Sequence, residues 1–198
     1  MPGQIKIDDG AGNYTVLTNG GSLGSDKTIT IPNTTGTMAL TSDISAGGLE
    51  EADIWWMTAD LTTDANPITA NLSRANGTLN DKLGTGMTVS SGIWTFPSTG
   101  YYEITFQTMS LHQTNSHVMN IYIYASDDNF GTTGDIISSA QNRGNSGEWE
   151  NWFISTIVKI SDVSNDKIYF RMQRNSAGTF YGNADGRTAF TFKKLGNI

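Results

Sequence analysis

Two histidines, His112 and His117, are the only imidazoles of the chain and stand in a stretch rich in serine and asparagine. Imidazole is the commonest general base, but a catalytic triad also needs a carboxylate that orients the ring and a nucleophile beside it. Neither histidine has a recognisable catalytic motif around it. We therefore expect both histidines in a solvated loop, with a histidine ring at an oligomer axis as the alternative.

Glu148 and Glu150 flank Trp149 and are the chain's best candidate for paired acid and base carboxylates, as in glycoside hydrolysis. Two residues apart on a strand, they would share one face. We interpret them as solvent-facing neighbours of an inward-turned Trp149. The sequence thus predicts no catalytic residue and no enzyme activity, with a glycosidase as the less favoured alternative.

Hard oxygen ligands gather at Ser126-Asp127-Asp128-Asn129, with Asp135 a little further on. Oxygen ligands in a loop suit Ca²⁺, but the EF-hand spacing is absent. A solvated acidic turn is the simpler interpretation. We expect no metal and no cofactor, and calcium near Asp127 and Asp128 stays open.

The segment 175–186 mixes aromatic, amide and acidic groups, which is the chemistry of a sugar site. Rings stack on a pyranose face while amides and acids bond its hydroxyls. The candidate glycan contacts are Phe180, Tyr181, Asn183 and Asp185. A glycine-rich apical turn is the alternative.

Three tyrosines fall out of phase with the aliphatic residues of their strands. In Val118–Tyr124, Met119, Ile121 and Ile123 alternate with Asn120, Tyr122 and Tyr124, and Tyr169 stands between Ile168 and Phe170. Because side chains alternate across a strand, these tyrosines must point away from the core. Exposed aromatic patches mark interfaces. We predict that Tyr122, Tyr124 and Tyr169 form a subunit interface.

Composition favours an all-β protein with many turns: the 198 residues include 22 glycines, and only 16% are charged. A net charge of -7 argues against nucleic acid as a partner, because phosphate binding needs clustered Lys and Arg. No cysteine occurs, which excludes disulfides and thiolate chemistry. The first residues lack an apolar run and no stretch is long enough to span a bilayer, so we expect neither a signal peptide nor a membrane partner.

Residues 53–198 carry eight to ten alternating segments separated by turn signals, which predicts a two-sheet antiparallel jelly roll. The clearest segment runs from Gly92 to Phe106. Pro97 ends one strand because it lacks a ladder donor, and Gly100 supplies the turn before the next. We also predict a strand at Pro67–Leu72 and a hairpin at Asn76-Gly77.

The spacing of Phe96, Pro97, Gly100, Tyr102 and Phe106 resembles the signature of tumour-necrosis-factor-like and complement globular-head jelly rolls. Ile160–Phe170 and Thr188–Phe192 are similar to that family's later strands, although its usual Ser-Gly-Phe near the end is absent. The resemblance implies a jelly roll that forms homotrimers through an outer face.

Residues 1–44 form a separate segment with four short alternating runs, and the Gly-rich residues 45–52 link it to the head domain at 53–198. The runs are Gln4–Ile7, Tyr14–Leu17, Thr28–Ile31 and Thr37–Leu40. So few apolar residues cannot close a core, so we expect this segment to anchor or trimerise by borrowing partners.

The run Asp26–Ile44 resembles a phrase common in bacteriophage tail fibres and other virion surface proteins. It implies a docking segment with Ile29, Ile31, Met38 and Leu40 as contacts. The expected function is that of a structural virion surface protein, a homotrimer bound to capsid or tail proteins. It would be a capsid decoration (cement) protein or a short fibre knob, assembled in the host cytoplasm. A receptor-binding adhesin for host glycans is the alternative.

Overall fold

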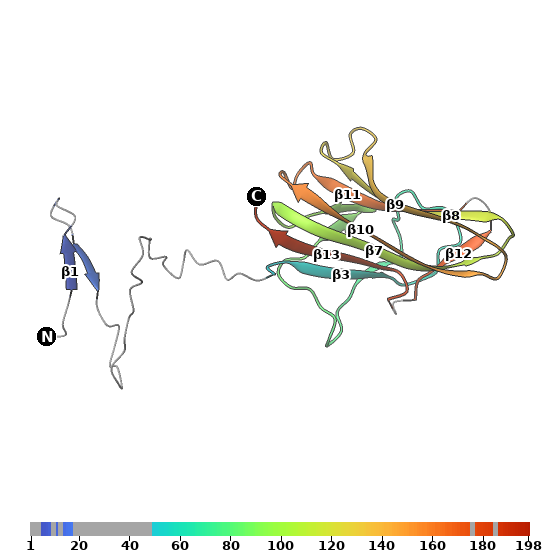
Figure 1. Cartoon of the computed structure of the whole chain (residues 1–198), viewed down its shortest axis with the longest axis horizontal. Helices are drawn as coiled ribbons and strands as arrows, with labels where there is room; N and C mark the ends of the chain where they lie inside the picture. The colour runs from blue at the N-terminus through green and yellow to red at the C-terminus, as the bar shows by residue number, and fades with distance from the viewer. Residues whose placement is uncertain (1–4, 9–10, 12–13, 18–48, 175–176, 184–185) are drawn as a thin grey trace, which may run out of the picture. The chain divides into compact units, whose positions relative to one another are not determined.

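The computed structural model describes residues 5–8, 11, 14–17, 49–174, 177–183 and 186–198. The chain divides into two compact units, Met1–Ala46 and Gly47–Ile198. The division falls inside the glycine-rich stretch 45–52 that the sequence marks as a linker. Figure 1 draws both units, and each is described by itself below.

In the first unit, β1 (Ile5–Asp8) and β2 (Tyr14–Leu17) pair as an antiparallel hairpin with Ile5 opposite Leu17. These two strands match the first two alternating runs of the sequence. The two further predicted runs, and with them Ile29, Ile31, Met38 and Leu40, lie outside the described residues. The docking contacts therefore stay a prediction.

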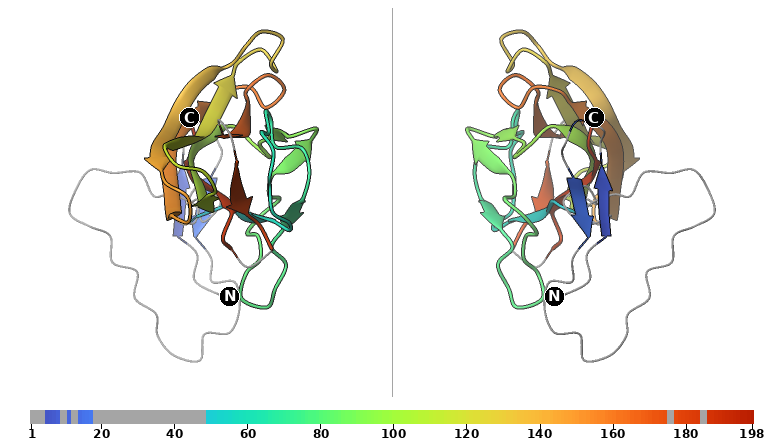
Figure 2. Two further views of the ribbon diagram at one scale, coloured as in Figure 1. Left: turned by 90° about the vertical axis from the view of Figure 1, so that its right-hand side faces the viewer. Right: turned by 90° about the vertical axis from the view of Figure 1, so that its left-hand side faces the viewer.

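The second unit is a sandwich of two antiparallel sheets, which confirms the predicted fold class (Figures 1 and 2). The six-stranded sheet has the order β10 (Trp149–Ile160), β7 (Gly100–His112), β13 (Ala189–Gly196), β3 (Ala52–Met57) and β4 (Leu72–Arg74), and β12 (Gly178–Tyr181) also pairs with β7. The five-stranded sheet has the order β5 (Thr88–Ser90), β6 (Ile93–Thr95), β11 (Lys167–Arg174), β8 (His117–Ser126) and β9 (Asp135–Gly144). In the described part of the chain, no helix is long and apolar enough to cross a membrane.

An aromatic cluster joins the two sheets at the centre of the core. Phe190 of β13 contacts Phe170 of β11 at 4.6 Å between ring centroids and Phe106 of β7 at 4.9 Å. Trp94 of β6 lies 5.0 Å from Phe192. All of these rings are fully buried. Each such ring contributes about 1.5–3 kcal/mol through burial, so the strand alternation that aims them inward fixes the register of both sheets.

The strand–turn–strand signature of the sequence is confirmed. Gly100 has φ +148°, and a Cβ there would lie 2.6 Å from the carbonyl oxygen of Gly196, so only glycine fits. After the turn, the Tyr102 hydroxyl donates to the carbonyl oxygen of Ser98 at 3.0 Å, and the Tyr102 ring packs on Phe96 at 4.8 Å. The turn thus starts β7, the long strand that pairs with β10, β12 and β13.

Three local predictions are wrong. Pro67–Leu72 is not a strand, since Pro67 lacks an amide donor and Asn71 takes φ +60°, and β4 begins only at Leu72. Asn76-Gly77 makes no hairpin, because β4 pairs with β3 and β5 with β6. The glycine-rich segment after Ser176 is not only a turn, since it holds β12, which pairs with the end of β7.

Candidate interaction surface

Three large apolar side chains of β10 point away from the core and stay in contact with water. Trp149 is 55% exposed, Phe153 67% and Ile157 62%. They stand four residues apart, and an even spacing on a strand places them on one face. Trp152, Ile154 and Ile160 occupy the other face and are buried. β10 is an edge strand, so this row lies at the side of the six-stranded sheet.

Neighbouring strands extend this row into a patch. Met109 and Leu111 of β7 lie opposite Asn151 and Trp149, and Tyr181 of β12 lies opposite Met109 on the other side of β7. We call the set Met109, Leu111, Trp149, Phe153, Ile157 and Tyr181 the apolar patch. The Tyr181 ring stacks on Trp149 with 5.0 Å between centroids. Contiguous apolar surface of this kind is typical of sites that bind another macromolecule.

A shallow hollow of about 330 Å³ opens within the apolar patch. Polar groups at its wall include Gln107, Asn151 and Arg187, beside Met109 and Phe153. The Gln107 side-chain amide donates to the carbonyl oxygen of Gly186 at 2.8 Å, which ties Gly186 to β7. The patch therefore combines apolar area with a few hydrogen-bonding groups, as protein interfaces do.

The outer face of the five-stranded sheet carries the three tyrosines of the predicted interface. Tyr124 and Tyr169 are cross-strand partners whose rings stack at 4.6 Å, and Phe130 packs on Tyr169 at 4.8 Å. Arg171 lies over the Tyr122 ring at 5.2 Å and donates Nη1–H to the Tyr124 hydroxyl at 3.2 Å. Burial raises the pKa of Tyr169, with Tyr124 adding to the effect and Arg171 opposing it.

These contacts leave Tyr124 only 8% exposed. All three tyrosines share a face opposite the core residues Ile121 and Ile123, but the chain's own Phe130 and Arg171 cover much of them. Their role as an interface stays a prediction. The row on β10 is not among the predictions from the sequence. Alternation could have found it, because Trp149, Phe153 and Ile157 are out of phase with the buried Trp152 and Ile154 and so lie outside.

The four candidate glycan contacts do not share one surface. Phe180 is fully buried in the core and exchanges backbone hydrogen bonds with Leu61, so it offers no surface to a ligand. Tyr181, the next residue on β12, points the opposite way into the apolar patch. Asn183 is exposed with φ +87°. Asp185 lies outside the described residues.

The expectation that His112 and His117 lie in a solvated loop is wrong. His112 ends β7 and His117 begins β8, with 0% and 3% exposure, and their ring centroids are 5.6 Å apart. Both are in phase with the inward residues of their strands, His112 with Phe106 and His117 with Met119. The alternation that builds the core therefore continues through polar residues to the end of both strands.

The interpretation of Trp149 as inward-turned is also wrong: Glu150 shares the Trp152 face of β10, and Trp149 is outside. Glu148 accepts the Asn145 backbone N–H at 2.6 Å, and this hydrogen bond, with that from the Asn145 side chain, lowers the Glu148 pKa. A general acid for glycoside cleavage needs a raised pKa. Glu148 precedes β10 and is exposed, whereas Glu150 is half-buried within the strand.

The acidic loop after β8 uses Asp128 to hold its own turn. Asp128 accepts the hydroxyls of Ser126 at 2.6 Å and Thr132 at 2.7 Å, and the Thr132 N–H at 3.0 Å. These hydrogen bonds lower the Asp128 pKa. Across the described residues, no three His, Cys, Asp or Glu side chains gather in a way that could hold a metal ion.

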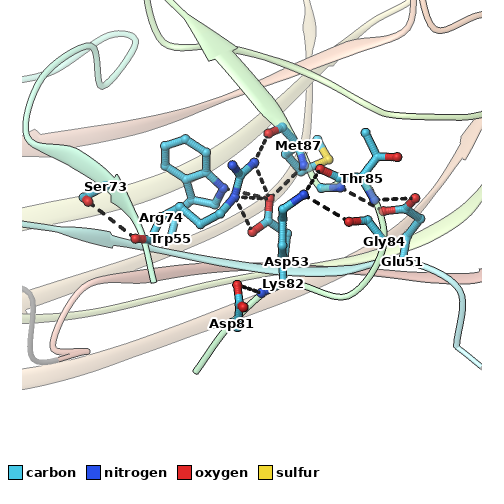
Figure 3. A network of polar contacts seen from close by, with 11 residues as sticks. Glu51, Asp53, Trp55, Ser73, Arg74, Asp81, Lys82, Gly84, Thr85 and Met87 are labelled. Atoms are coloured by element: carbon cyan, nitrogen blue, oxygen red, sulfur yellow. Dashed lines mark hydrogen bonds and ion pairs between the residues drawn. The ribbon is translucent and has the colours of Figure 1, made fainter. Parts of the chain in front are cut away.

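A second polar cluster, drawn in Figure 3, centres on the buried Asp53 of β3. Asp53 accepts Arg74 Nε–H at 3.0 Å, the Trp55 indole N–H at 2.9 Å and the Met87 backbone N–H at 2.7 Å. Arg74 also donates to the Met87 carbonyl and lies over the Trp55 ring at 4.7 Å. The carboxylate has its hydrogen-bonding capacity filled by protein groups, so the cluster acts structurally and fastens the 75–87 connection to β3 and β4.

No protein-family model and no curated protein matches this chain. Solved structures do match it. The TNF protein Eiger from S. frugiperda aligns with a TM-score of 0.56 and 10% identity over 74% of this chain and 93% of that one. Murine APRIL, in a crystal structure at pH 5.0, aligns with a TM-score of 0.55 and 12% identity over 73% of this chain and 98% of that one. The second unit therefore has the tumour-necrosis-factor-like jelly-roll fold that the Gly92–Phe106 signature predicts.

Proposed function

We propose that this chain is a structural protein of a bacteriophage particle. It forms a homotrimer that docks through its N-terminal segment and presents the jelly-roll unit outward, as a capsid decoration protein or a short fibre knob. The resemblance of Asp26–Ile44 to virion surface proteins supports the location, and the tumour-necrosis-factor-like fold supports the trimer. No catalytic step enters this function.

The observation that carries the proposal is the apolar patch on β10, β7 and β12. Its exposed row Trp149, Phe153 and Ile157 is the kind of surface that a monomer rarely leaves in water. In the trimer, we assign this patch to the contact between copies. Burial there would remove apolar area at a gain of about 25 cal/mol per Å². This assignment replaces the tyrosine face as our proposed subunit contact.

A trimer turns three weak docking segments into one firm attachment. Once one segment is bound, the other two act at a high effective concentration set by the linker, so overall avidity exceeds the affinity of one segment by about 100-fold or more. The linker at 45–52 is rich in small residues, which lets three segments reach separate sites. The net charge of -7 keeps a particle surface protein soluble.

Binding of a host glycan is a second candidate function. The stacked rings of Trp149 and Tyr181 beside the amides of Gln107 and Asn151 provide stacking surface and hydrogen-bonding groups. The two candidates use the same patch, so they exclude each other there. If the trimer buries the patch, a glycan array probed with the full chain gives no signal; a signal lost on Trp149→Ala favours the adhesin.

The test of location is reconstitution on the particle. Full-length protein is added to particles of the encoding phage that lack it, and cryo-electron microscopy locates the added density on head or tail. We expect trimeric knobs with wild type and none with Ile31→Asp/Leu40→Asp, whose head unit is unchanged. A particle that carries no such density with wild type contradicts the proposal, and equal binding of the variant removes the docking role of this segment.

A further inference from the structure

His112 and His117 contact each other at one end of the core, where the chain passes from β7 to β8. Their ring planes meet at 75° with centroids 5.6 Å apart. His112 has no solvent exposure, and among the residues that the structure describes neither its Nδ1 nor its Nε2 has a hydrogen-bond partner. A neutral imidazole offers one donor and one acceptor. His117 is also buried, at 3% exposure, and burial disfavours the charged form of its ring.

Two glycines close the space around the rings. A Cβ on Gly144 of β9 would lie 2.5 Å from Cδ2 of His112, so the β9 backbone packs directly on that ring. A Cβ on Gly178 of β12 would lie 3.2 Å from Nε2 of His117. The rings are thus enclosed by backbone from β9 and β12, which brings no charge to them.

The charged groups around the pair come from three places. Arg174 of β11 donates Nη1–H to the Gly178 carbonyl at 2.7 Å, and its backbone N–H is accepted by Asp64 at 2.9 Å. Burial is the main cause that lowers the His117 pKa, followed by His112 and Arg174, while Asp64 opposes them. Glu148 precedes β10 and interacts with His112, and Glu150 shares the inward face of β10.

We propose that the His112–His117 contact is an acid-sensitive latch, which holds this end of the sandwich closed while the His117 ring is neutral and opens it when His117 gains a proton. Exposed hydrogen bonds also join the turns that it holds, from Ser116 N–H to Asn145 Oδ1 at 3.3 Å and from Ser146 N–H to Asn115 Oδ1 at 3.0 Å. The His112 N–H donates to the Glu148 carbonyl at 2.9 Å, and the His112 carbonyl accepts Gly147 N–H at 2.8 Å. Gln113 N–H donates to Ala177 at 3.4 Å. Opening therefore frees the turns 113–116 and 145–148.

Opening also reaches the apolar patch, since Trp149 follows Glu148 directly and its stacking partner Tyr181 is on β12. Acid would then loosen the contact between copies. This consequence rests on the proposed function, whereas the opening itself does not.

The sign of the pH effect follows from proton linkage. Because the folded state lowers the His117 pKa, the unfolded or opened chain binds more protons in mild acid. The closed state keeps its full stability above about pH 6.5, the ordinary imidazole pKa, and loses it as the pH falls toward the lowered folded value. Each imidazole that gains a proton only on opening raises the opening equilibrium constant about tenfold per pH unit. Asp128, Glu148 and Asp162 have lowered pKa values, so these carboxylates titrate below this window.

Amide hydrogen exchange of the full-length protein at pH 7.5 and pH 5.5, corrected for intrinsic rates, tests the latch. We expect exchange in peptides from 110–119 and 144–149 to rise at least about tenfold at pH 5.5, while peptides from β6 and the middle of β11 keep their protection. His112→Phe/His117→Phe retains aromatic rings beside Gly144 and should lose the response. Static light scattering at both pH values separates opening from any change in association.

Several results would overturn the latch. One is unchanged exchange in 110–119 at pH 5.5; another is a response of the same size in the double phenylalanine variant. Should that variant not fold, the His117 Cε1–H signal of wild type decides, because its titration near pH 6.5 without opening contradicts the proposal. A chelator that opens the same segments at pH 7.5 would show that the rings hold a metal ion instead. If the wild-type chain is monomeric and still opens in acid, the proposed trimer is wrong and the latch is supported.

Discussion

The two sheets present aromatic residues to the outside in different ways. On β10, Trp149, Phe153 and Ile157 remain largely in water. On β8 and β11, Tyr124 and Tyr169 stack on each other and are covered by Phe130 and Arg171 of the same chain. The aromatic residues on the outer face of the five-stranded sheet are thus covered by the same chain, whereas the β10 row is not covered.

An aromatic side chain that points away from the core is not, for that reason alone, part of an interface. Strand alternation says which way a side chain points, and it places both sets outside. What separates them is coverage by segments distant in sequence, such as the loop that brings Phe130 over Tyr169. The uncovered row is therefore the better candidate for a partner.

The largest effect is expected from removing the uncovered row. Phe153→Thr/Ile157→Thr keeps residues that suit a strand and removes most of the exposed apolar area. If each is worth about 2 kcal/mol at the contact, the dissociation constant for one contact between copies rises about 1000-fold. Sedimentation equilibrium over a concentration series measures it.

The matched control for this change is Tyr122→Thr on the covered face, which should leave the trimer intact. Both variants should unfold within about 1 kcal/mol of wild type, as surface substitutions do. A trimer that survives the β10 changes and dissociates with Tyr122→Thr would reverse the comparison and restore the tyrosines as the interface.

Next in size is Tyr169→Ala on the covered face. Tyr169 packs on both Tyr124 and Phe130, so its loss should lower the free energy of unfolding by about 2–3 kcal/mol. Chemical denaturation measures it, and the oligomeric mass should not change. Tyr169→Phe keeps the stacking and should stay near wild type; a large loss there would mean that the hydroxyl, not the ring, matters.

A smaller effect is expected from Arg171→Met, which keeps the apolar stem. It removes the cation over Tyr122 and the hydrogen bond to the Tyr124 hydroxyl, which together contribute about 1 kcal/mol. The change should appear in the denaturation midpoint with an unchanged slope. No shift at all would indicate that Arg171 does not cover this face in solution.

The smallest effect concerns alkaline pH. Burial raises the pKa of Tyr169, so its folded state favours the protonated phenol. The stabilisation is complete below about pH 10, the ordinary tyrosine pKa, and is lost as the pH rises above it. Tyr169→Phe should flatten the alkaline fall in stability, read from thermal melts between pH 9 and 11. An unchanged dependence of stability on pH would show that water already reaches the Tyr169 hydroxyl in the folded state.

The fold could be predicted because its determinants are local. Period-two alternation of bulky residues places Phe106, Phe170 and Phe190 in one core, and Pro97 with Gly100 fixes the start of β7. The sequence predicts a solvated loop at the histidines because Ser110, His112 and His117 are polar, so the continuation of β7 and β8 through them is not evident from hydrophobicity. Their phase with Phe106 and Met119 was the signal that could have found them.

Coverage of the tyrosines could not be predicted from the sequence. It depends on Phe130, whose φ of +57° turns its ring toward Tyr169, and on Arg171 across the strand pair from Tyr122. Both are tertiary contacts that no strand pattern encodes. The β10 row follows from alternation alone, because Trp149, Phe153 and Ile157 are each out of phase with the buried Trp152 and Ile154.

Sedimentation equilibrium of the full-length wild-type chain at micromolar concentration tests the central claim, that copies of this chain associate through the uncovered row. We predict a mass three times the 21.4 kDa of one chain. A mass of one chain at every concentration would contradict the account.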